Sequence, residues 1–327
     1  MRYKRVKKID HDFSVLGFGC WGASGKGSWT DHGDKEQIKA IRAAIDAGVN
    51  FFDVAPVYGL GHAEEVLGKA IKGHRNDIFI ASKVGLPWNE RQEVRNDVSR
   101  ANIMMEIEES LKRLNVEYVD LYQVHWPSTE GVPLEETIEA MRDIKASGKA
   151  RYIGLSNFSV ESYKKANEIV DIVSMQGLFN MLEHNPKSYH DIPLEYQTAK
   201  EVLPLCEEEG LAFLPYSPLF QGLLTGKITA DTIFGKDDVR NANPKLRGNE
   251  RIRHLSVLDE IKNIESLQNK KLAEIALNYL IAQKNVTSVI ATQANIEEVM
   301  ANIKALEWEM DQTTVGAIDE LVKTKLL

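Results

Sequence analysis

Four side chains that could share one reaction stand at the ends of short apolar runs. Asp53, Lys83 and His125 each end or interrupt such a run, and Tyr58 follows the first run in the next loop. Ionisable groups among apolar residues are costly to bury unless they pair. The carboxyl ends of the strands of a parallel barrel meet at one mouth, so these four groups can lie together there.

The residue types indicate what such a site would do. A phenol titrates near pH ~10, so Tyr58 protonates an alkoxide usefully only if a neighbour favours its ionised form. Lys83, held charged by Asp53, would provide this. His125 could donate a hydrogen bond to a carbonyl oxygen and stabilise negative charge as a hydride arrives. The set predicts carbonyl reduction with Tyr58 as the acid.

Other interpretations of these residues stay open. Asp53 and Lys83 could be a buried ion pair that only stabilises the fold, and His125 a core histidine. Alternatively, Lys83 could be the Schiff-base nucleophile of an aldolase or isomerase built on the same barrel.

The elements that must position these residues alternate along the chain. Eight β-rich apolar runs, each followed by a segment of helical periodicity, predict one (β/α)8 barrel domain over residues 1–327. Gly48, Gly148 and Gly210 stand before three of the runs, where a left-handed helix cap is wanted. The predicted strands are residues 15–19, 50–55, 78–84, 119–126, 152–156, 172–176, 212–216 and 288–291.

Four segments depart from this repeat. Residues 6–9 and 13–16 flank Asp10-His11-Asp12 and predict an N-terminal hairpin that closes the bottom of the barrel. The polar segments 21–33 and 221–253 are long enough to be functional covers. Residues 295–325 carry two further helical patterns after the eighth strand.

Composition excludes several classes of function. A formal net charge of −8 and a pI near 5.6 argue against nucleic acid or an anionic membrane as a partner. Two cysteines are too few for a disulfide framework, and no signal peptide is visible, so we expect a cytoplasmic protein. His184 and His190 have no other potential metal ligands at known spacings. We therefore expect them to be ordinary loop residues and expect no metal site.

Two nucleotide-like motifs fail on context. Residues 17–22 match G-x-G-x-x-G, but a dinucleotide fingerprint must open a helix directly, and a polar loop follows here. Gly25-Lys26 and Gly226-Lys227 lack the upstream glycine and the following Ser or Thr of a phosphate loop.

Across nearly the whole chain, the sequence resembles the aldo-keto reductases. The likeness rests on the surroundings of the four residues, such as Asp53-Val-Ala-Pro-Val-Tyr58-Gly, and on three further runs that begin at Gly154, Gln176 and Pro215. The resemblance implies that Asp53, Tyr58, Lys83 and His125 are catalytic, that Tyr58 is the proton donor, and that the substrate is a small carbonyl compound.

The resemblance also implies a nicotinamide cofactor. Members of this family usually take NADP(H), and NAD(H) is the alternative. Ala294 stands where relatives often have arginine, and Glu298 brings a carboxylate to the site of the 2′-phosphate. The implied cofactor residues are Cys20, Trp21, Asp53, Ser156, Asn157, Gln176, Tyr216, Ser217, Pro218, Leu219, Gln221, Gly222, Leu223, Thr292, Ala294, Glu298 and Asn302.

Aromatic residues at the strand ends predict the substrate pocket. Trp21, Trp29, Trp88 and Trp126 all lie at or beyond these ends and could pack on the apolar part of a carbonyl substrate. A different class of function also fits the resemblance, since related barrels serve as regulatory subunits that bind cofactor and a protein partner.

Overall fold

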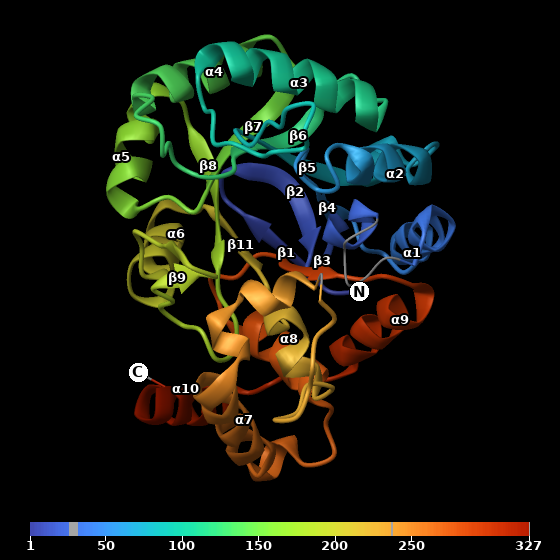
Figure 1. Cartoon of the computed structure of the whole chain (residues 1–327), viewed down its shortest axis with the longest axis vertical. Coiled ribbons are helices and arrows are strands. Elements are labelled where there is room, and N and C mark those ends of the chain that lie inside the picture. The colour runs from blue at the N-terminus through green and yellow to red at the C-terminus, as the bar shows by residue number, and fades with distance from the viewer. Residues whose placement is uncertain (26–31, 237, 327) are drawn as a thin grey trace.

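The computed structural model describes residues 1–25, 32–236 and 238–326, and its centre is a closed parallel barrel (Figure 1). The strands are buried on both sides, because helices cover the outside and side chains fill the inside. They run in sheet order β11-β8-β7-β6-β5-β4-β3-β12. Their bounds are β3 Leu16–Gly19, β4 Phe51–Asp53, β5 Phe79–Val84, β6 Val119–Val124, β7 Ala150–Ser156, β8 Ile172–Leu178, β11 Ala212–Tyr216 and β12 Val289–Thr292.

A bridge between Phe213 and Val286 closes the barrel, where the Thr287 amide donates to the Phe213 carbonyl at 2.9 Å. The eight predicted runs all contain barrel strands, which confirms the predicted fold class. Two predicted ends were too long, because Val54-Ala55 and His125-Trp126 have already left the sheet at its mouth.

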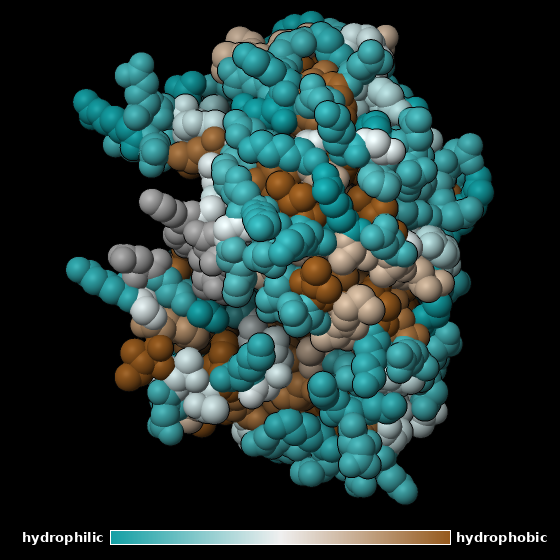
Figure 2. All heavy atoms as spheres, turned by 90° about the vertical axis from the view of Figure 1, so that its right-hand side faces the viewer, coloured by the Kyte–Doolittle hydropathy of each residue, from teal (hydrophilic) through white to brown (hydrophobic). Residues whose placement is uncertain are grey.

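Helices connect consecutive strands and pack on the outside of the sheet (Figure 1). Hydrophilic residues cover most of the face formed by α1, α2 and α9 (Figure 2), as expected for helices with one buried side. The helices of the repeat are α1 Asp34–Asp46, α2 His62–Ala70, α3 Arg100–Leu114, α4 Leu134–Ala146, α5 Val160–Ile169, α6 Leu203–Glu209, α8 Leu272–Ala282 and α9 Ile296–Lys304.

Local signals explain where these helices begin and end. Ser99 and Ser159 accept hydrogen bonds from the first turns of α3 and α5. The three glycines predicted as caps, Gly48, Gly148 and Gly210, have φ of 88°, 79° and 69°, which confirms that prediction.

The N-terminal hairpin is present, but its predicted bounds were wrong. Strands β1 (Tyr3–Val6) and β2 (Ile9–Ser14) pair antiparallel, so Asp10-His11-Asp12 lies inside the second strand and the turn falls at residues 7–8. The polar triplet resembles a turn, but it lies in a strand with one exposed face. Asp10 and Asp12 face solvent, while Ile9 and Phe13 are buried. Phe13 packs against Phe51 and Phe79, which begin β4 and β5, so the hairpin closes the amino-terminal end of the barrel.

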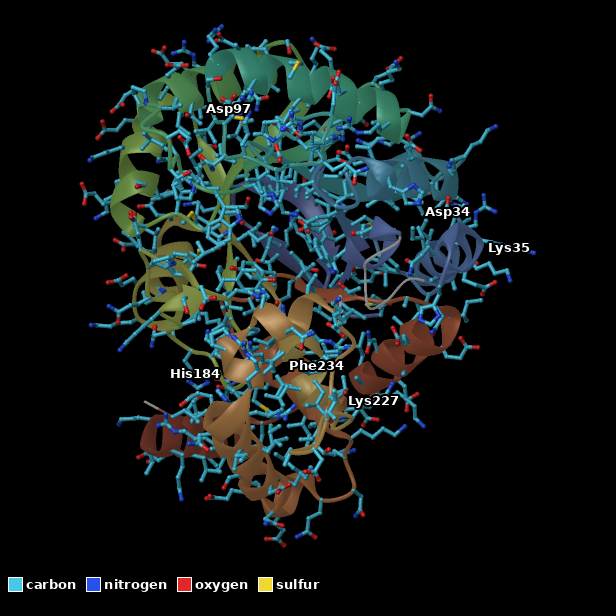
Figure 3. The ribbon with its side chains drawn as sticks, viewed as in Figure 1. Asp34, Lys35, Asp97, His184, Lys227 and Phe234 are labelled. Atoms are coloured by element: carbon cyan, nitrogen blue, oxygen red, sulfur yellow. The ribbon has the colours of Figure 1, made fainter. Side chains whose placement is uncertain are left out.

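The two long polar segments lie at the other end. Helix α1 begins at Asp34, labelled in Figure 3, so the first segment ends where the sequence predicts; its residues 26–31 lie outside the described part. The second segment holds three short turns, η4 (Phe220–Thr225), η5 (Val239–Ala242) and η6 (Pro244–Leu246), and Figure 3 labels Lys227 and Phe234 within it. Helix α7 (Gly248–Lys262) starts inside the predicted loop, so this loop is shorter than expected.

Two helices lie outside the repeat. Helix α10 (Gln312–Leu326) packs with α7 at the side of the barrel (Figure 1). Together with α9, it confirms the two helical patterns predicted after the eighth strand.

Candidate active site

The ammonium of Lys83 is the centre of the polar cluster in the barrel mouth. Its Nζ donates to Asp53 Oδ1 at 2.6 Å, to the Val54 carbonyl at 3.1 Å and to the Tyr58 hydroxyl at 3.3 Å. Lys83 is fully buried and Asp53 nearly so. The end of β5 thus places Lys83 beside Asp53 at the end of β4, and the turn after β4 places Tyr58 beside Lys83.

The imidazole of His125 completes the group. The centroid of this ring lies 6.0 Å from that of the Tyr58 ring, in an edge-to-face arrangement. The backbone amide of His125 donates to the Val84 carbonyl at 3.0 Å. The structure therefore brings Asp53, Tyr58, Lys83 and His125 together, from four places in the chain.

Burial determines the protonation of these groups. Burial and the charge of Asp53 raise the pKa of Tyr58 well above its ordinary value, so the phenol carries its proton. Burial, with the charge of Lys83, lowers the pKa of His125 well below its ordinary value, so the imidazole is neutral. The expected ionisation of Tyr58 by Lys83 is not found, because burial, and after it the charge of Asp53, favours the protonated phenol.

A second set of polar groups lies beside the first. Gln176 donates to Asp53 Oδ2 at 2.9 Å, and Asn157 donates to the His125 carbonyl at 3.1 Å. The Asn157 oxygen accepts from the Tyr216 hydroxyl at 2.8 Å and the Tyr196 hydroxyl at 3.0 Å. Ser156 joins the set through Asn157 Nδ2, 3.2 Å from Ser156 Oγ. Asn157, with φ of 66°, turns the chain out of β7 at this point.

The turn after β11 has an unusual backbone. Ser217, Phe220, Gln221 and Gly222 have φ of 55°, 46°, 51° and 97°, and the Phe220 and Gly222 amides donate within the turn to the Ser217 and Leu219 carbonyls. Among the described residues, a Cβ at Gly222 would come within 4 Å of just two atoms, Ile228 Cδ1 and Arg240 Nη1. An open backbone with a guanidinium beside it suits the pyrophosphate of a dinucleotide, and Pro218, Leu219 and Leu223 belong to the same turn.

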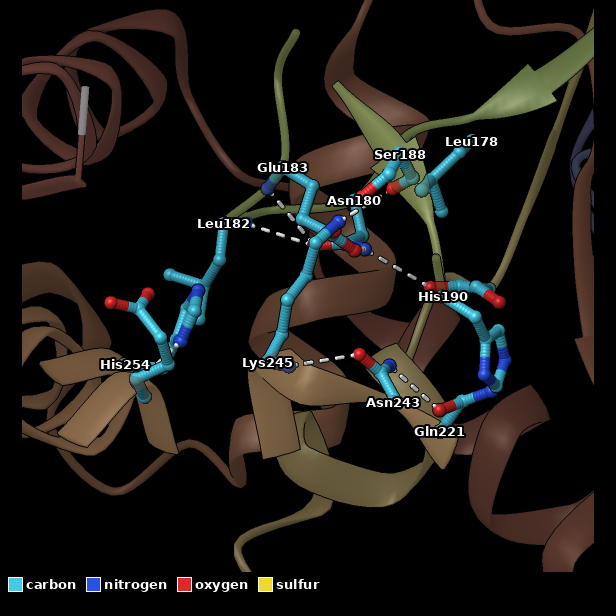
Figure 4. Close-up of polar contacts among 12 residues, drawn as sticks. Leu178, Asn180, Leu182, Glu183, Ser188, His190, Gln221, Asn243, Lys245 and His254 are labelled. Carbon is cyan, nitrogen blue, oxygen red and sulfur yellow. Dashed lines mark hydrogen bonds and ion pairs between the residues drawn. The ribbon is translucent and has the colours of Figure 1, made fainter. Parts of the chain in front are cut away.

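Residues far along the chain hold this turn in place (Figure 4). The Gln221 amide contacts His190 Nε2 at 2.8 Å and accepts from Asn243 at 2.9 Å. Lys245 donates to Glu183 Oε1 at 2.5 Å and to the Ser188 carbonyl at 2.7 Å.

Most of these supporting residues could not be predicted from the sequence. Gln221 was predicted, but no local motif marks Glu183, Tyr196, Asn243 or Lys245. His184 and His190 do lie in the loop after β8, but His184 is buried and stacks on Tyr279 at 5.7 Å, so it packs the core.

The segment after β12 forms a variant of the capping box, in which the glutamate accepts from the residue before the N-cap. Asn295 Oδ1 accepts from the Glu298 amide at 2.9 Å, and Glu298 Oε2 accepts from the Ala294 amide at 2.9 Å. The Ala294 side chain is fully buried, and Thr292 and Asn302 lie at the two ends of this segment. The carboxylate of Glu298 is therefore fixed at the beginning of α9.

The predicted substrate-pocket tryptophans lie in different places. Trp21 stands edge-on to Tyr58 at 5.1 Å, and Cys20 beside it is buried. Trp126 lies 6.4 Å from Tyr189, which the sequence analysis missed and whose own ring contacts Tyr216 at 5.3 Å. Both tryptophans belong to the mouth.

Trp88 lies elsewhere, and Trp29 falls outside the described residues. The Trp88 ring faces the Arg113 guanidinium at 5.6 Å and lines an outer groove of about 860 Å³ between α2 and α3. The β5–α3 segment turns away from the mouth after Gly85, and strand-end position alone could not show this. The structure does not bring Trp88 to the Tyr58 cluster.

The described residues contain no group of three or more His, Cys, Asp or Glu side chains that could hold a metal ion. None of their helices is long and apolar enough to cross a membrane.

Comparison with known proteins agrees with this geometry. The model of the Aldo/keto reductase family matches residues 15–323. The aldo-keto reductase YhdN of Bacillus subtilis is 35% identical over 86% of this chain and 82% of its own. The NADH-specific methylglyoxal reductase of Escherichia coli is 27% identical over 97% and 99%. A solved glycerol dehydrogenase from Gluconobacter oxydans superimposes with a TM-score of 0.86 at 30% identity, covering 99% of this chain and 96% of that one.

The barrel, the cluster at its mouth and these similarities agree: the chain belongs to the aldo/keto reductase family and is an oxidoreductase.

Proposed function

We propose that this protein reduces small aldehydes or ketones to alcohols with NADH, and that Tyr58 is the acid of the reaction. The observation that carries the proposal is the hydrogen bond of 3.3 Å between the Tyr58 hydroxyl and Lys83 Nζ, with Asp53 behind it. A phenol held by an ammonium at the mouth of a barrel is placed to give a proton to a substrate oxygen.

When bound, a reduced nicotinamide would supply the hydride that the carbonyl carbon accepts. Tyr58, which carries its proton because burial raises its pKa, gives that proton to the carbonyl oxygen. The Lys83 ammonium stabilises the phenolate that remains, and Asp53 keeps Lys83 charged and in place. The neutral His125 orients the carbonyl by a hydrogen bond from its ring N–H.

The contacts of Lys83 argue against a Schiff-base mechanism. A lysine nucleophile needs a neutral amine with a free lone pair. The Lys83 nitrogen donates to three acceptors within 3.3 Å, one of them the carboxylate of Asp53, and this favours the charged form. Reduction with borohydride in the presence of substrate should therefore leave Lys83 unmodified.

The segment between β12 and α9 supports NADH as the cofactor over the NADP(H) that the family resemblance implies. Glu298 places a carboxylate at the beginning of α9, where it would repel a 2′-phosphate but accept from a ribose hydroxyl. Ala294 offers no positive charge in compensation. The relative in Escherichia coli is named for its specificity for NADH, which supports the proposal.

The aromatic walls and the named relatives support a small oxygenated substrate. Trp21 and Trp126 can cover the carbon side of a compound whose carbonyl faces Tyr58. The relatives named above act on methylglyoxal and glycerol, both three-carbon compounds. Two buried free cysteines support a reducing cytoplasm as the site of action.

A small panel of carbonyl compounds tests the activity. We expect oxidation of NADH, followed by its absorbance, with methylglyoxal or a related three- to four-carbon aldehyde or ketone. Tight cofactor binding without turnover across the panel would instead favour a regulatory subunit.

Replacing Tyr58 by phenylalanine tests the assignment of the acid. Tyr58→Phe should lower kcat about 10²- to 10⁴-fold, because it removes the proton donor. Cofactor affinity, measured by fluorescence titration, should stay near that of the wild type. Wild-type turnover in this variant would refute the assignment.

A further inference from the structure

Glu64 is a buried carboxylate of α2 that contacts β5, the strand of Lys83. We propose that it is a positioning residue, which acts through Ser82 to hold Tyr58 at hydrogen-bond distance from Lys83. The inference rests on the proposed role of Tyr58 as the acid.

Tyr58 takes its place from helix α2. Its carbonyl accepts from the Ala63 amide at 3.2 Å in the first turn of this helix, and its amide donates to the Ala55 carbonyl at 3.1 Å. The backbone of Tyr58 is therefore fixed relative to the beginning of α2, whereas Lys83 belongs to β5. The distance between the phenol and the ammonium depends on how α2 sits against β5.

Glu64 is the polar contact between these two elements. It lies in the first turn of α2 and is fully buried. Its Oε1 accepts from Ser82 Oγ at 2.8 Å, and Ser82 is the residue directly before Lys83. Alternate residues of a strand face opposite sides, so Ser82 points to α2 while Lys83 points into the barrel.

Arg113 fixes the other oxygen of Glu64. Its Nε donates to Glu64 Oε2 at 2.7 Å from the last turn of α3, and its Nη2 donates to Ser110 Oγ at 3.3 Å. The Arg113 side chain passes close over Gly61, where a Cβ would come within 2.7 Å of Arg113 Cδ. The turn between Tyr58 and Glu64 is thus held from both sides.

A buried ion pair adds little net stability, because desolvation offsets the attraction. Its directional hydrogen bonds nevertheless allow one geometry. At this place, that geometry sets the Tyr58–Lys83 contact, and a misplacement of about 1 Å at a reacting group can cost on the order of 100-fold in rate.

The test compares two serines that contact the same cluster. Ser82→Ala removes the link between Glu64 and the strand of Lys83, whereas Ser110→Ala makes the same chemical change on the far side of Arg113. We expect Ser82→Ala to lower kcat about three- to tenfold, to raise the solvent deuterium isotope effect on kcat and to leave the affinity for NADH unchanged. Ser110→Ala should behave as the wild type.

Variants of Glu64 provide a second series. Glu64→Ala should lower kcat more than Ser82→Ala, and Glu64→Gln should recover part of the loss, because its amide oxygen can still accept from Ser82. If Glu64→Ala does not fold, the comparison of the serines still decides the question. A wild-type isotope effect and kcat in Ser82→Ala, or an equal loss in Ser110→Ala, would overturn the proposal.

Tyr58→Phe separates the two proposals. If Tyr58→Phe is nearly inactive and Ser82→Ala is unaffected, only the role of Glu64 fails. If Tyr58→Phe keeps wild-type turnover, the assigned acid fails, and the role of Glu64 fails with it.

Discussion

At the scale of single residues, burial and pairing assign each group its protonation state. The Lys83 nitrogen lies in a fully buried place, where three acceptors surround it and compensate for the loss of water. His125 has no such partner for a positive charge, and burial lowers its pKa well below the ordinary value. The site therefore combines one fixed cation with two neutral groups that can donate hydrogen bonds to a substrate oxygen.

We expect one residue, Glu298, to decide the proposed preference for NADH. Glu298→Gln should lower the KM for NADPH about three- to tenfold with little change for NADH, because it removes a carboxylate from the site of the 2′-phosphate while an oxygen can still cap α9. Steady-state kinetics with both cofactors measures the shift. Glu297→Gln, an exposed neighbour in the same turn, is the matched control, and an equal shift there would point to a general charge effect.

Glu106 gives a pH dependence of stability. Burial raises the pKa of this carboxyl from 4.5 to about 7, so the folded protein holds the proton more tightly than the unfolded chain. Its stabilising contribution is complete below about pH 4.5 and is lost as the pH rises through about 7.

Glu106→Gln should remove this loss, because an amide stays neutral and can still accept from Asn102. We expect the variant to be more stable than the wild type at pH 8, by an amount that shrinks towards pH 5. Urea unfolding at several pH values measures it, and a difference independent of pH would contradict the assigned cause. Turnover should not change.

At the scale of elements, Lys4 is one of the side chains that attach the N-terminal hairpin to the barrel. Lys4, on β1, donates from Nζ to the carbonyls of Ile281, Gln283 and Val286 at 2.8–3.0 Å. These carbonyls belong to the end of α8 and the residues that follow it, where no further helical turn satisfies them.

Lys4→Met should destabilise the protein by about 1.5–3 kcal/mol, the value of hydrogen bonds from a charged group. Thermal unfolding measures the effect. Lys7→Met, at an exposed position in the turn of the same hairpin, should leave the melting temperature unchanged. An equal fall in both variants would show that the hairpin is sensitive to any loss of charge.

At the scale of the whole molecule, the added C-terminal helix shares the main core. Val315, Ile318 and Val322 of α10 are buried in the same cluster as the barrel helices. The Tyr279 hydroxyl of α8 donates to Asp319 at 2.5 Å, which ties the two helices together.

Because the core is continuous, damage at α10 should affect the whole fold. Ile318→Ala should cost about 2–5 kcal/mol. Loss of helical circular dichroism and loss of activity should still coincide in one transition at lower temperature. An early separate loss of helical signal, with activity retained, would show that α10 unfolds on its own.

The repeat and the four candidate catalytic side chains could be predicted from the sequence alone. Apolar runs of strand length, separated by helical periodicity, have few packing solutions, and Asp53, Lys83 and His125 stood out because charges among apolar residues need partners. It erred where the pattern is ambiguous, as at the hairpin, whose second strand carries Asp10 and Asp12 on its exposed side.

The contacts that support the candidate site could not be predicted from the sequence. Glu64, Ser82 and Arg113 come from three elements, and each of these residue types would be ordinary at its own place in the sequence. Likewise, Trp88 and Trp126 follow neighbouring strands, but only one turns into the mouth. The physical reason is that hydrogen bonds and ring contacts act over a few ångströms, whereas the pattern along a chain fixes the neighbours of an element and not the path of each loop or side chain.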